Sequence, residues 1–473
     1  MPQSFYPPQD FSPPIVQEEE IRAIFKNSDK DKWVLMVVVG TKPDFYKQAP
    51  LIYWANKKGV PVICATTGQH FDDLLGYGIK EFNLKPLIDL RIKGDLLQKA
   101  TDIFYKIGSL AKWFQKEFPE RTIVPIPHGD TLTAAIVSAA WFLSIRSGVA
   151  QNEAGIRGMN PVSFHDINLF KERISDPSAF VREQWKGKWE LNRAEPWPEQ
   201  WDTFVSGAGA NYLLAACEIN RQNLLREGYP DESIRVVGNS VVDAIKLVPK
   251  PKESVFTDFP QLEEYDDWIR VDVHRRGNLT ERRFKAIVQG VLSLVKKGVP
   301  ITWCELTATR QALDFFNLRK KVLQANEKYP NFLFTPLWRE YGQVIEFWKS
   351  GRCFAELTDS GSIQEELNEI QEVLCLTLRF NTDRPESISE AHSNVLVPPA
   401  SAENIALLVE HIRNDKELIS QMRTAPKIYG ENVSAKIMDW FLEEMAKKTR
   451  PFTWAHERIY GPDKGTEKTV DFL

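Results

Sequence analysis

The segment WVLMVVVGTKPDFYKQAP, residues 33–50, decides the fold class of this chain of 473 residues. It opens with a continuous apolar run, which is typical of a strand buried on both faces of a parallel sheet. The run ends at Gly40, and a helical stretch follows with Pro43 near its first turn. A strand, a short loop and a helix in this order predict one half of a right-handed crossover unit.

The same alternation recurs along the chain. Further strands are predicted at Val60–Gly68 and Arg121–Asp130, each followed by helical sequence. A second series of strands begins after Pro249 and is predicted at residues 268–274, 299–306, 331–337, 352–360 and 372–378. The predicted fold class is therefore α/β, with two Rossmann-like doubly wound domains and a cleft between them.

These two series give the expected division of the chain. Residues 1–32 form an N-terminal extension, and residues 33–248 form the first Rossmann-like domain. Residues 249–430 form the second, and residues 431–473 form a helix and a tail that pack back across the hinge. A length of 473 residues agrees with two domains, because single hydrophobic cores rarely grow so large.

Composition excludes several classes of function. Lys and Arg number 60 and Asp and Glu number 64, so the chain has no overall attraction for nucleic acid or anionic membranes. Its five cysteines form no CxxC pair, which suits a reducing compartment and argues against a structural zinc site. The N-terminus lacks the pattern of a signal peptide, and no stretch of 18 apolar residues occurs. We therefore expect a cytoplasmic protein with neither a nucleic-acid nor a membrane partner.

Polar residues gather where four of the predicted strands end. These clusters are Lys42, Asp44 and Lys47; His128 and Asp130; His274, Arg275 and Arg276; and Ser360, Gly361 and Ser362 with Glu365 and Glu366. Basic residues together with a Gly-Ser before a helix suit a diphosphate, because helix N-termini favour anions. The carboxylates of Asp130 and Glu153 can serve proton transfer if burial raises their pKa values. Taken singly, each cluster also fits an ordinary helix cap or a solvated strand end.

Nine segments resemble the sequence blocks of the non-hydrolysing UDP-N-acetylglucosamine 2-epimerases, in the order and at roughly the spacing of that family. They are GTKPDFYKQAP (40–50), TGQH (67–70), HGDT (128–131), NEAGIR (152–157), NRQNLLREG (220–228), VVGNSVVDA (236–244), VDVHRRGN (271–278), DSGSIQEE (359–366) and TDRPE (382–386). The resemblance identifies the chain as a divergent member of this family. It implies the GT-B arrangement, in which the second domain binds UDP and a UDP-sugar lies between the domains of a homodimer.

The implied reaction interconverts UDP-GlcNAc and UDP-ManNAc without NAD or a metal. It begins with removal of the C2 proton and anti elimination of UDP, which gives 2-acetamidoglucal. UDP then adds again, and C2 is reprotonated from the opposite face. Such a reaction needs acid/base groups on both faces of the sugar ring and fixed positive charge at the leaving diphosphate.

Matching of the motifs implies a role for each functional position. The implied catalytic residues are Asp130, Glu153, Glu199 and His274. The implied substrate- and UDP-binding residues are Lys42, Lys47, Gln69, His70, Arg157, Arg275, Ser360, Gly361, Ser362, Glu366 and Arg384. Within the second set, residues 360–362 would cradle the diphosphate and Glu366 would hold the ribose hydroxyls. No metal ligand is implied.

The chain departs from the family pattern on the sugar side. Lys42 stands where the family has arginine, and a lysine lacks the two-pronged grip of a guanidinium on phosphate. Gln151 replaces a histidine, and the substrate arginine of the family falls on Thr203.

Residues 158–195 resemble an insertion in the first domain. One interpretation is a solvated excursion on the domain surface. The other is a lid or an altered sugar pocket in which Trp185 and Trp189 stack on a sugar face. The departures also leave two alternative functions open: a related NDP-sugar enzyme, such as a hydrolysing epimerase or a glycosyltransferase-like enzyme, or a catalytically silent UDP-sugar-binding protein.

Overall fold

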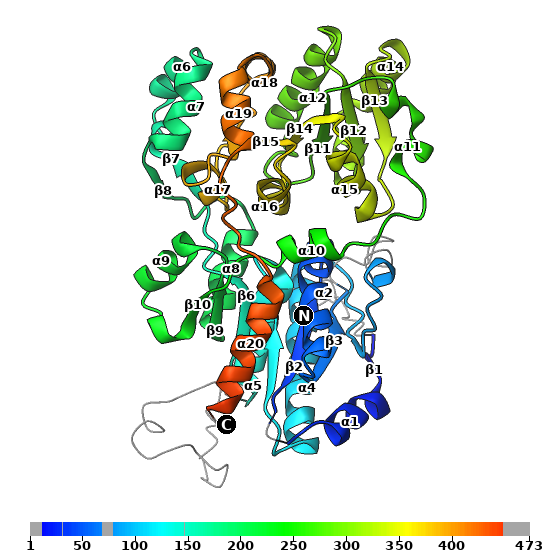
Figure 1. Ribbon diagram of the computed structural model, residues 1–473, viewed down its shortest axis with the longest axis vertical. Coiled ribbons are helices and arrows are strands. Elements are labelled where there is room, and N and C mark those ends of the chain that lie inside the picture. Colours follow the sequence, from blue (N-terminus) through cyan, green and yellow to red (C-terminus); the bar gives the residue numbers. More distant parts are fainter. Residues whose placement is uncertain (1–11, 31, 69–78, 146, 448–473) are drawn as a thin grey trace, which may run out of the picture.

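The computed structural model describes residues 12–30, 32–68, 79–145 and 147–447. Within these ranges the main sheets form two lobes, which Figure 1 shows one above the other. The residues predicted to form the outer parts of the N-terminal extension and of the C-terminal tail, 1–11 and 448–473, lie outside the described residues. In the part of the chain that is described, no helix is both long and apolar enough to span a bilayer.

The first lobe contains two sheets that meet along one edge strand of each. The five-stranded sheet has, in spatial order, β1 (Ile15–Val16), β4 (Ile88–Asp89), β3 (Val62–Thr66), β2 (Val34–Val39) and β5 (Ile123–Ile126). The three-stranded sheet has β10 (Ile234–Val236), β9 (Ala210–Ala215) and β6 (Val149–Ala154). A parallel bridge between His128 and Asn152 joins β5 to β6. The strand pairs are parallel apart from β1 with β4.

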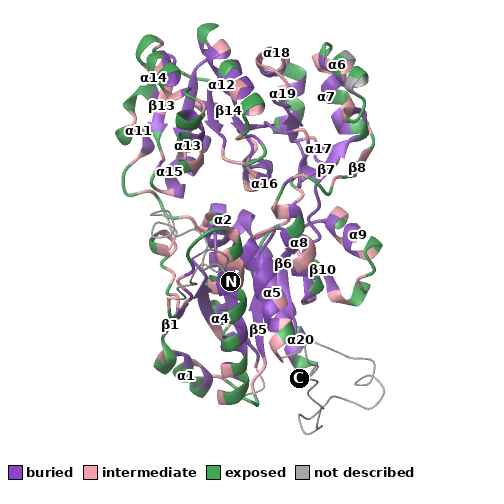
Figure 2. Cartoon of the chain, turned by 180° about the vertical axis from the view of Figure 1, so that it is seen from behind, coloured by how far each residue is buried: buried purple, intermediate pink, exposed green. Residues whose placement is uncertain are grey.

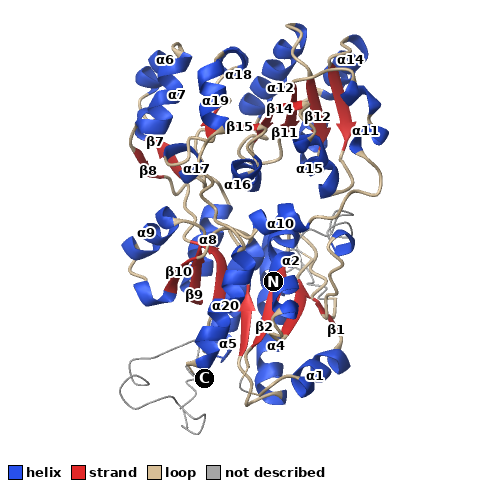
Figure 3. Cartoon of the chain, in the orientation of Figure 1, coloured by secondary structure: helices blue, strands red, loops and turns tan. Residues whose placement is uncertain are grey.

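Helices cover both faces of the five-stranded sheet (Figure 3). The helices of this lobe are α1 (Glu18–Asn27), α2 (Lys42–Lys57), α4 (Leu96–Glu117), α5 (Leu132–Ile145), α8 (Glu199–Ala208), α9 (Glu218–Arg226), α10 (Val241–Leu247) and α20 (Val433–Ala446). Side chains of β2 alternate between two cores, because successive residues of a strand point to opposite faces. Val34 and Met36 pack with α4 and α5, whereas Leu35 and Val37 pack with α2 and α20.

The second lobe is built on one parallel sheet of six strands. In spatial order these are β13 (Phe332–Pro336), β12 (Ile301–Glu305), β11 (Trp268–Asp272), β14 (Cys353–Thr358), β15 (Leu374–Thr377) and β16 (Asn394–Leu396). Its helices are α11 (Val255–Asp258), α12 (Glu281–Lys296), α13 (Thr307–Phe315), α14 (Arg319–Lys328), α15 (Tyr341–Lys349), α16 (Gly361–Ile370), α17 (Glu386–Ser389), α18 (Ala402–Asn414) and α19 (Lys416–Arg423). Figure 2 shows the buried strands beneath helices that keep exposed outer faces. The predicted α/β fold class is thus confirmed, and the predicted strands are present within a few residues.

Each lobe has a point at which the strand order reverses. In the first lobe the chain winds outward from β2 through β3 and β4, and in the other direction through β5, β6 and β9. In the second lobe the reversal lies between β11 and β14. Doubly wound sheets bind ligands at such switch points, beyond the carboxyl ends of the strands. The four predicted polar clusters follow β2, β5, β11 and β14, so they lie at the two switch points.

Residues 158–195 leave the first lobe and pack on the second. They form β7 (Met159–Pro161), β8 (Trp189–Leu191), α6 (Ile167–Ile174) and α7 (Pro177–Lys186). Figure 1 shows α6 and α7 beside α18 and α19, and α7 contacts β16, α17 and α18.

This packing contradicts the first interpretation of the segment and the tryptophan stacking of the second, whereas an altered sugar pocket stays a prediction. Trp185 is 4% exposed within the core of the second sheet, and its indole nitrogen donates to the carbonyl of Asn394 at 3.0 Å. Trp189 packs against the same core and donates to the carbonyl of Gln184 at 2.8 Å. The expectation that these two rings stack on a sugar is wrong, because core packing occupies both. Nor is the segment a solvated excursion. The domain boundaries predicted at 33, 249 and 431 stay predictions.

Candidate active site

Glu153 owes its orientation to a β-bulge at the end of β6. The register between β6 and β9 shifts at this residue, and Glu153 has a φ of 60°. A bulge re-aims one side chain without ending the strand, and it often does so beside functional sites. The Glu153 carboxylate is thereby buried at the switch point of the first lobe.

Four nitrogen-bearing side chains surround the Glu153 carboxylate. Lys47 contacts Oε1, the amide of Asn239 donates to it at 2.7 Å, and His128 Nε2 lies 3.2 Å away. Arg384 of the second lobe reaches Oε2 at 3.3 Å. Burial alone would raise the pKa of Glu153, but Lys47, His128 and Arg384 hold that pKa well below its ordinary value. The sequence predicts that Glu153 serves proton transfer if burial raises its pKa. The pKa is lowered instead, so that condition is not met.

Asp130 lies beside Glu153 but in a different electrostatic environment. Arg384 is the cation that faces it, with Nη1 3.6 Å from Asp130 Oδ2. Burial raises the pKa of Asp130, and although Arg384 opposes the rise, the carboxylates of Asp383 and Glu199 add to it. When two neighbouring carboxyl groups have pKa values shifted in opposite directions, one can act as the general acid and the other as the general base.

His128 is held as a cation between two carboxylates. Its Nδ1 lies 2.9 Å from Asp44 Oδ1, and its Nε2 faces Glu153. Burial lowers the pKa of an imidazole, yet Glu153 and Asp44 outweigh that effect and raise the pKa of His128 to about 9. Asp44 is fixed in turn by backbone donors, since its Oδ2 accepts from the amides of Gly40 and Thr41, each at 2.9 Å.

A buried ion-pair network joins the two lobes. Lys47 of α2 contacts both Glu153 and Glu365 of α16. Arg384 closes the network, because its Nε donates to Glu365 Oε1 at 2.8 Å while it also reaches Glu153. Buried charges of this kind are tolerated only when paired, so each member depends on the others.

The N-terminus of α16 forms the second half of the site. Ser360 precedes the helix, and Ser362 Oγ donates to Glu366 Oε1 at 2.6 Å. A Cβ atom on Gly361 would lie 3.1 Å from Arg275 Nη2 and 3.3 Å from Arg384 Nη1, so both guanidinium groups lie over the first turn. The dipole of α16 and two arginines over its first turn suit an anion.

His274 follows β11 and stands at the switch point of the second lobe. Its Nδ1 is 2.9 Å from Asp272 Oδ1 and 3.4 Å from Asp359 Oδ1. Burial lowers the pKa of His274, but these two carboxylates outweigh burial, and the net pKa is raised. Arg275, the next residue, forms an ion pair with Glu199 of α8 in the first lobe.

Asp272, His274 and Asp359 are also a possible metal-ligand group, with ligand atoms within 4.8 Å of one another. Both oxygens of Asp359 already accept hydrogen bonds. Oδ1 accepts from the amide of His274 at 2.9 Å, and Oδ2 accepts from the amide of Arg275 at 3.0 Å and from Asn278 at 3.0 Å. These contacts fit a role for Asp359 in fixing the turn after β11.

Two aromatic rings lie next to the predicted nucleotide residue Glu366. The hydroxyl of Tyr341 donates to Glu366 Oε2 at 3.0 Å, and the ring of Tyr341 stacks on that of Tyr46 with centroids 4.2 Å apart. Lys42 Nζ lies 5.7 Å from the Tyr46 ring centroid. Burial lowers the pKa of Lys42, although Asp272 is among the groups that oppose this.

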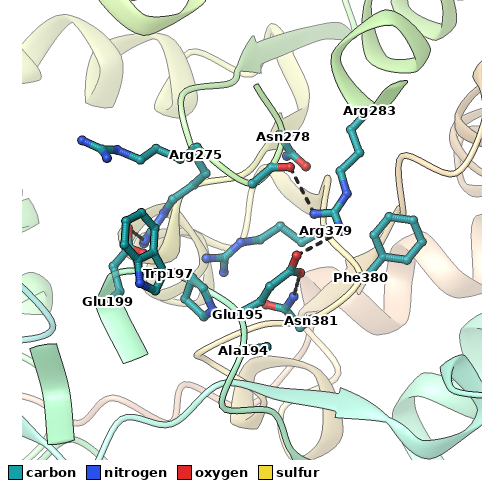
Figure 4. Close-up of a pocket in the computed structure, with 13 residues that line it drawn as sticks. Ala194, Glu195, Trp197, Glu199, Arg275, Asn278, Arg283, Arg379, Phe380 and Asn381 are labelled. Atoms are coloured by element: carbon teal, nitrogen blue, oxygen red, sulfur yellow. Dashed lines mark hydrogen bonds and ion pairs between the residues drawn. The ribbon is translucent and has the colours of Figure 1, made fainter. Parts of the chain in front are cut away.

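A cavity of about 230 Å³ opens beside Arg275 and Glu199 (Figure 4). It is lined by arginine, asparagine, aromatic and acidic side chains, among them Glu195, Trp197, Asn278, Arg283, Arg379, Phe380 and Asn381. The walls come from both lobes, because residues 194–199 lead into α8 and the others belong to the second lobe.

Most predicted site residues lie at the switch points of the two lobes, around the charge network and the N-terminus of α16. Three are exceptions: one lies apart, and two fall outside the described residues. Arg157 pairs with Glu227 at 2.5 Å and donates to Thr203 Oγ1 at 3.1 Å rather than joining the charge network. Gln69 and His70 lie outside the described residues. Gln151, where the family pattern has a histidine, is buried, and its side-chain amide donates to the carbonyl of Gly129 at 3.4 Å.

Sequence reasoning missed two acidic residues of the site. Asp383 pairs with Arg379 at 2.8 Å and with Arg384 at 2.9 Å. Asp202 lies one helical turn after Glu199 on α8 and is 2% exposed. The spacing of three residues from Glu199 was a usable signal, since positions i and i+3 share a helix face.

Two doubly wound lobes, joined by a buried charge network beside the N-terminus of α16, define an α/β protein of the GT-B type. Residues 188–442, just over half of the chain, match the UDP-N-acetylglucosamine 2-epimerase family, and the chain belongs to that family.

Individual relatives agree with this assignment. The UDP-N-acetylglucosamine 2-epimerase of Methanocaldococcus jannaschii is 28% identical over 81% of this chain and 93% of its own length. That of Escherichia coli K12 is 27% identical over 84% and 95%. The M. jannaschii enzyme solved with UDP-GlcNAc and UDP has a TM-score of 0.67, 26% identity, and coverage of 87% and 99%. The Neisseria meningitidis enzyme bound to UDP-GlcNAc has a TM-score of 0.69 at 24% identity, with coverage of 87% and 100%.

Proposed function

We propose that this protein interconverts UDP-GlcNAc and UDP-ManNAc by elimination and re-addition of UDP. The observation that carries the proposal is the meeting of Asp130 and Glu153 with the N-terminus of α16 through Arg384. Proton transfer at C2 and departure of UDP must occur together on one sugar, so carboxylates and an anion site must lie side by side. The substrates named for the relatives support the choice of sugar nucleotide.

The pKa shifts of Glu153 and Asp130 support the roles of general base and general acid, respectively, in this scheme. Glu153, with a lowered pKa, is the ionised carboxylate that accepts the C2 proton in this scheme. Asp130, with a raised pKa, returns a proton on the other face. Glu199 completes the acid/base set from α8, next to Arg275. Each proton moves between a carboxyl group and C2, so no redox partner is needed for this scheme.

Positive charge on the second lobe would stabilise the departing diphosphate. His274 is protonated up to a higher pH than an ordinary histidine, because its pKa is raised. With Arg275, which lies over the first turn of α16, and with the dipole of that helix, it supplies the fixed charge that a leaving diphosphate requires. Glu366 and Tyr341 are placed to hold the ribose in this scheme. We propose that neither NAD nor a metal takes part.

The assembly we propose is a homodimer in the cytoplasm. Supporting the dimer, α4 and α5 of the first lobe carry exposed apolar side chains, namely Leu97, Phe104, Tyr105 and Leu143. Helices α4 and α5 pack against each other, so these side chains belong to one helical layer. Supporting a reducing compartment, all five cysteines are buried and free.

Proton NMR in D₂O tests the function directly. Incubation with UDP-GlcNAc should produce the anomeric signal of UDP-ManNAc and place deuterium at C2 of both sugars. Free UDP with ManNAc or the glycal as the end products would instead identify a hydrolysing enzyme. Bound UDP without any deuterium exchange would refute epimerisation of this substrate.

A further inference from the structure

Glu195 lies where the chain returns from the second lobe to α8, four residues before Glu199. Its side chain is one third exposed. Oε1 accepts from Arg283 Nη2 at 3.0 Å, and Oε2 accepts from the amide of Asn381 at 2.6 Å. Figure 4 shows these two contacts at the wall of the cavity. We call Glu195, Arg283 and Asn381 the clamp.

Both partners of Glu195 are fixed within the second lobe. Arg283 of α12 also donates to the carbonyl of Gly277 at 3.1 Å, and its guanidinium lies 5.0 Å from the ring centroid of Phe380. A guanidinium with three such contacts has little freedom to follow a moving loop. Asn381 is buried and follows β15.

The other end of the 158–195 segment is attached to the same loop. The amide of Met159 donates to the carbonyl of Thr382 at 2.8 Å, and the amide of Thr382 donates back at 2.9 Å. The segment thus leaves the first lobe after Glu153 and returns to it before Glu199. Near both carboxylates, the chain is tied to residues 381 and 382 of the second lobe.

A short, stiff connection carries the position of Glu195 to Glu199. The intervening residues are Pro196, Trp197 and Pro198, and each proline ring restricts its own backbone φ. The amide of Gln200 donates to the carbonyl of Pro196 at 2.9 Å, so the first turn of α8 is bonded to this connection. Glu199 then meets Arg275, which lies over the N-terminus of α16.

We infer that Glu195 is a positioning residue: through the clamp it holds Glu199 on the second lobe, beside Arg275. The inference rests on the proposed function, in which Glu199 is an acid/base carboxylate. The clamp does not include the serines of α16 or His274. Arg275 also faces Asp383 of its own lobe, with Nη2 3.6 Å from Oδ2, so it should stay at the nucleotide site when Glu199 is displaced. Loss of the clamp should therefore lower turnover and leave UDP affinity unchanged.

The test compares three variants of the full chain. Glu195→Ala removes both hydrogen bonds. Glu195→Gln keeps an acceptor for Arg283, and Asn381 can turn its amide, because its Oδ1 has no hydrogen-bond partner among the described residues. The matched control is Glu183→Ala on α7, which removes an ion pair to Arg173, 3.9 Å away, in the same segment.

We expect Glu195→Ala to lower kcat about 10- to 100-fold, because small misplacements of a catalytic group are that costly. The Kd for UDP should stay within about twofold, and amide hydrogen exchange should rise in residues 192–200. Glu195→Gln should recover most of the loss, and Glu183→Ala should match the wild type in all three measurements.

Three results would overturn the inference: an unchanged kcat in Glu195→Ala, unchanged exchange in residues 192–200, or an equal loss in Glu183→Ala. A failure of the proposed function can be distinguished from a failure of the clamp. If the wild type does not act on UDP-GlcNAc, that function is refuted, and the clamp is then judged by hydrogen exchange alone. Faster exchange in Glu195→Ala but not in Glu183→Ala would still support the clamp.

Discussion

Replacing Asp202 with asparagine should stabilise the protein, and increasingly so as pH rises. Asp202 is 2% exposed, and its Oδ1 has no hydrogen-bond partner among the described residues. Burial raises the pKa of Asp202 from its ordinary value of 3.8 to about 8, and the nearby carboxylates Asp130 and Glu199 add to the rise. Asparagine has nearly the same shape and carries no charge.

The magnitude follows from proton linkage. The unfolded chain loses the Asp202 proton near pH 4, whereas the folded protein keeps it to about pH 8. Between these values the folded state binds more protons, so stability falls as pH rises, by at most about 1.4 kcal/mol per pH unit for this group. Across the whole window the loss is at most roughly 6 kcal/mol. The variant lacks this loss.

Urea unfolding, followed by tryptophan fluorescence at pH 5, 6, 7 and 8, measures the effect. The difference in unfolding free energy between Asp202→Asn and wild type should grow at each step upward in pH. Asp231→Asn is the control, since Asp231 is exposed and pairs with Arg221 at the surface. Parallel pH dependences for wild type and Asp202→Asn would refute the argument.

Three further predictions concern the network and the proposed chemistry. Asp130→Asn should reduce turnover by about 10²- to 10⁴-fold with UDP affinity retained, which titration calorimetry and NMR can check together. Lys47→Met should lower the unfolding free energy by about 3–5 kcal/mol, seen as a lower urea midpoint, because it removes one of the two buried cations that Glu153 and Glu365 share. The pKa of His274 is raised, so its cation persists above pH 6.5, and kcat should fall only as pH rises past that raised pKa. His274→Gln should remove this limb of the kcat–pH profile.

The fold was predictable because its strands carry a strong local signal. The run at 34–39 is apolar throughout, and every residue of β2 is buried. The segment 158–195 could not be placed in the same way. Its aromatic residues indicate burial, but the surface that buries Phe170, Phe180 and Trp185 belongs to strands and helices about 200 residues further along the chain. No local pattern specifies such a partner.

The site was predictable as a set of residues, but not in its electrostatics. A predicted strand end located Asp130 and the family resemblance located Glu153, whereas the sign of each pKa shift depends on which cation the fold brings near. Glu153 receives Lys47 and His128 from two other strand ends, and its pKa falls. Asp130 is left with Arg384 at 3.6 Å and with neighbouring carboxylates, and its pKa rises.

The crossing of the chain between lobes has a consequence for folding during synthesis. The core of the second sheet includes α6 and α7, which lie in the sequence between elements of the first lobe. The core of the first lobe includes α20 from near the end of the chain. A fragment that stops at residue 248 would expose the apolar face of α7 and leave Leu35 and Val37 without α20. The first lobe therefore completes its core only after α20 has emerged, behind the whole second lobe, so the final structure of both lobes should form late in synthesis or after it.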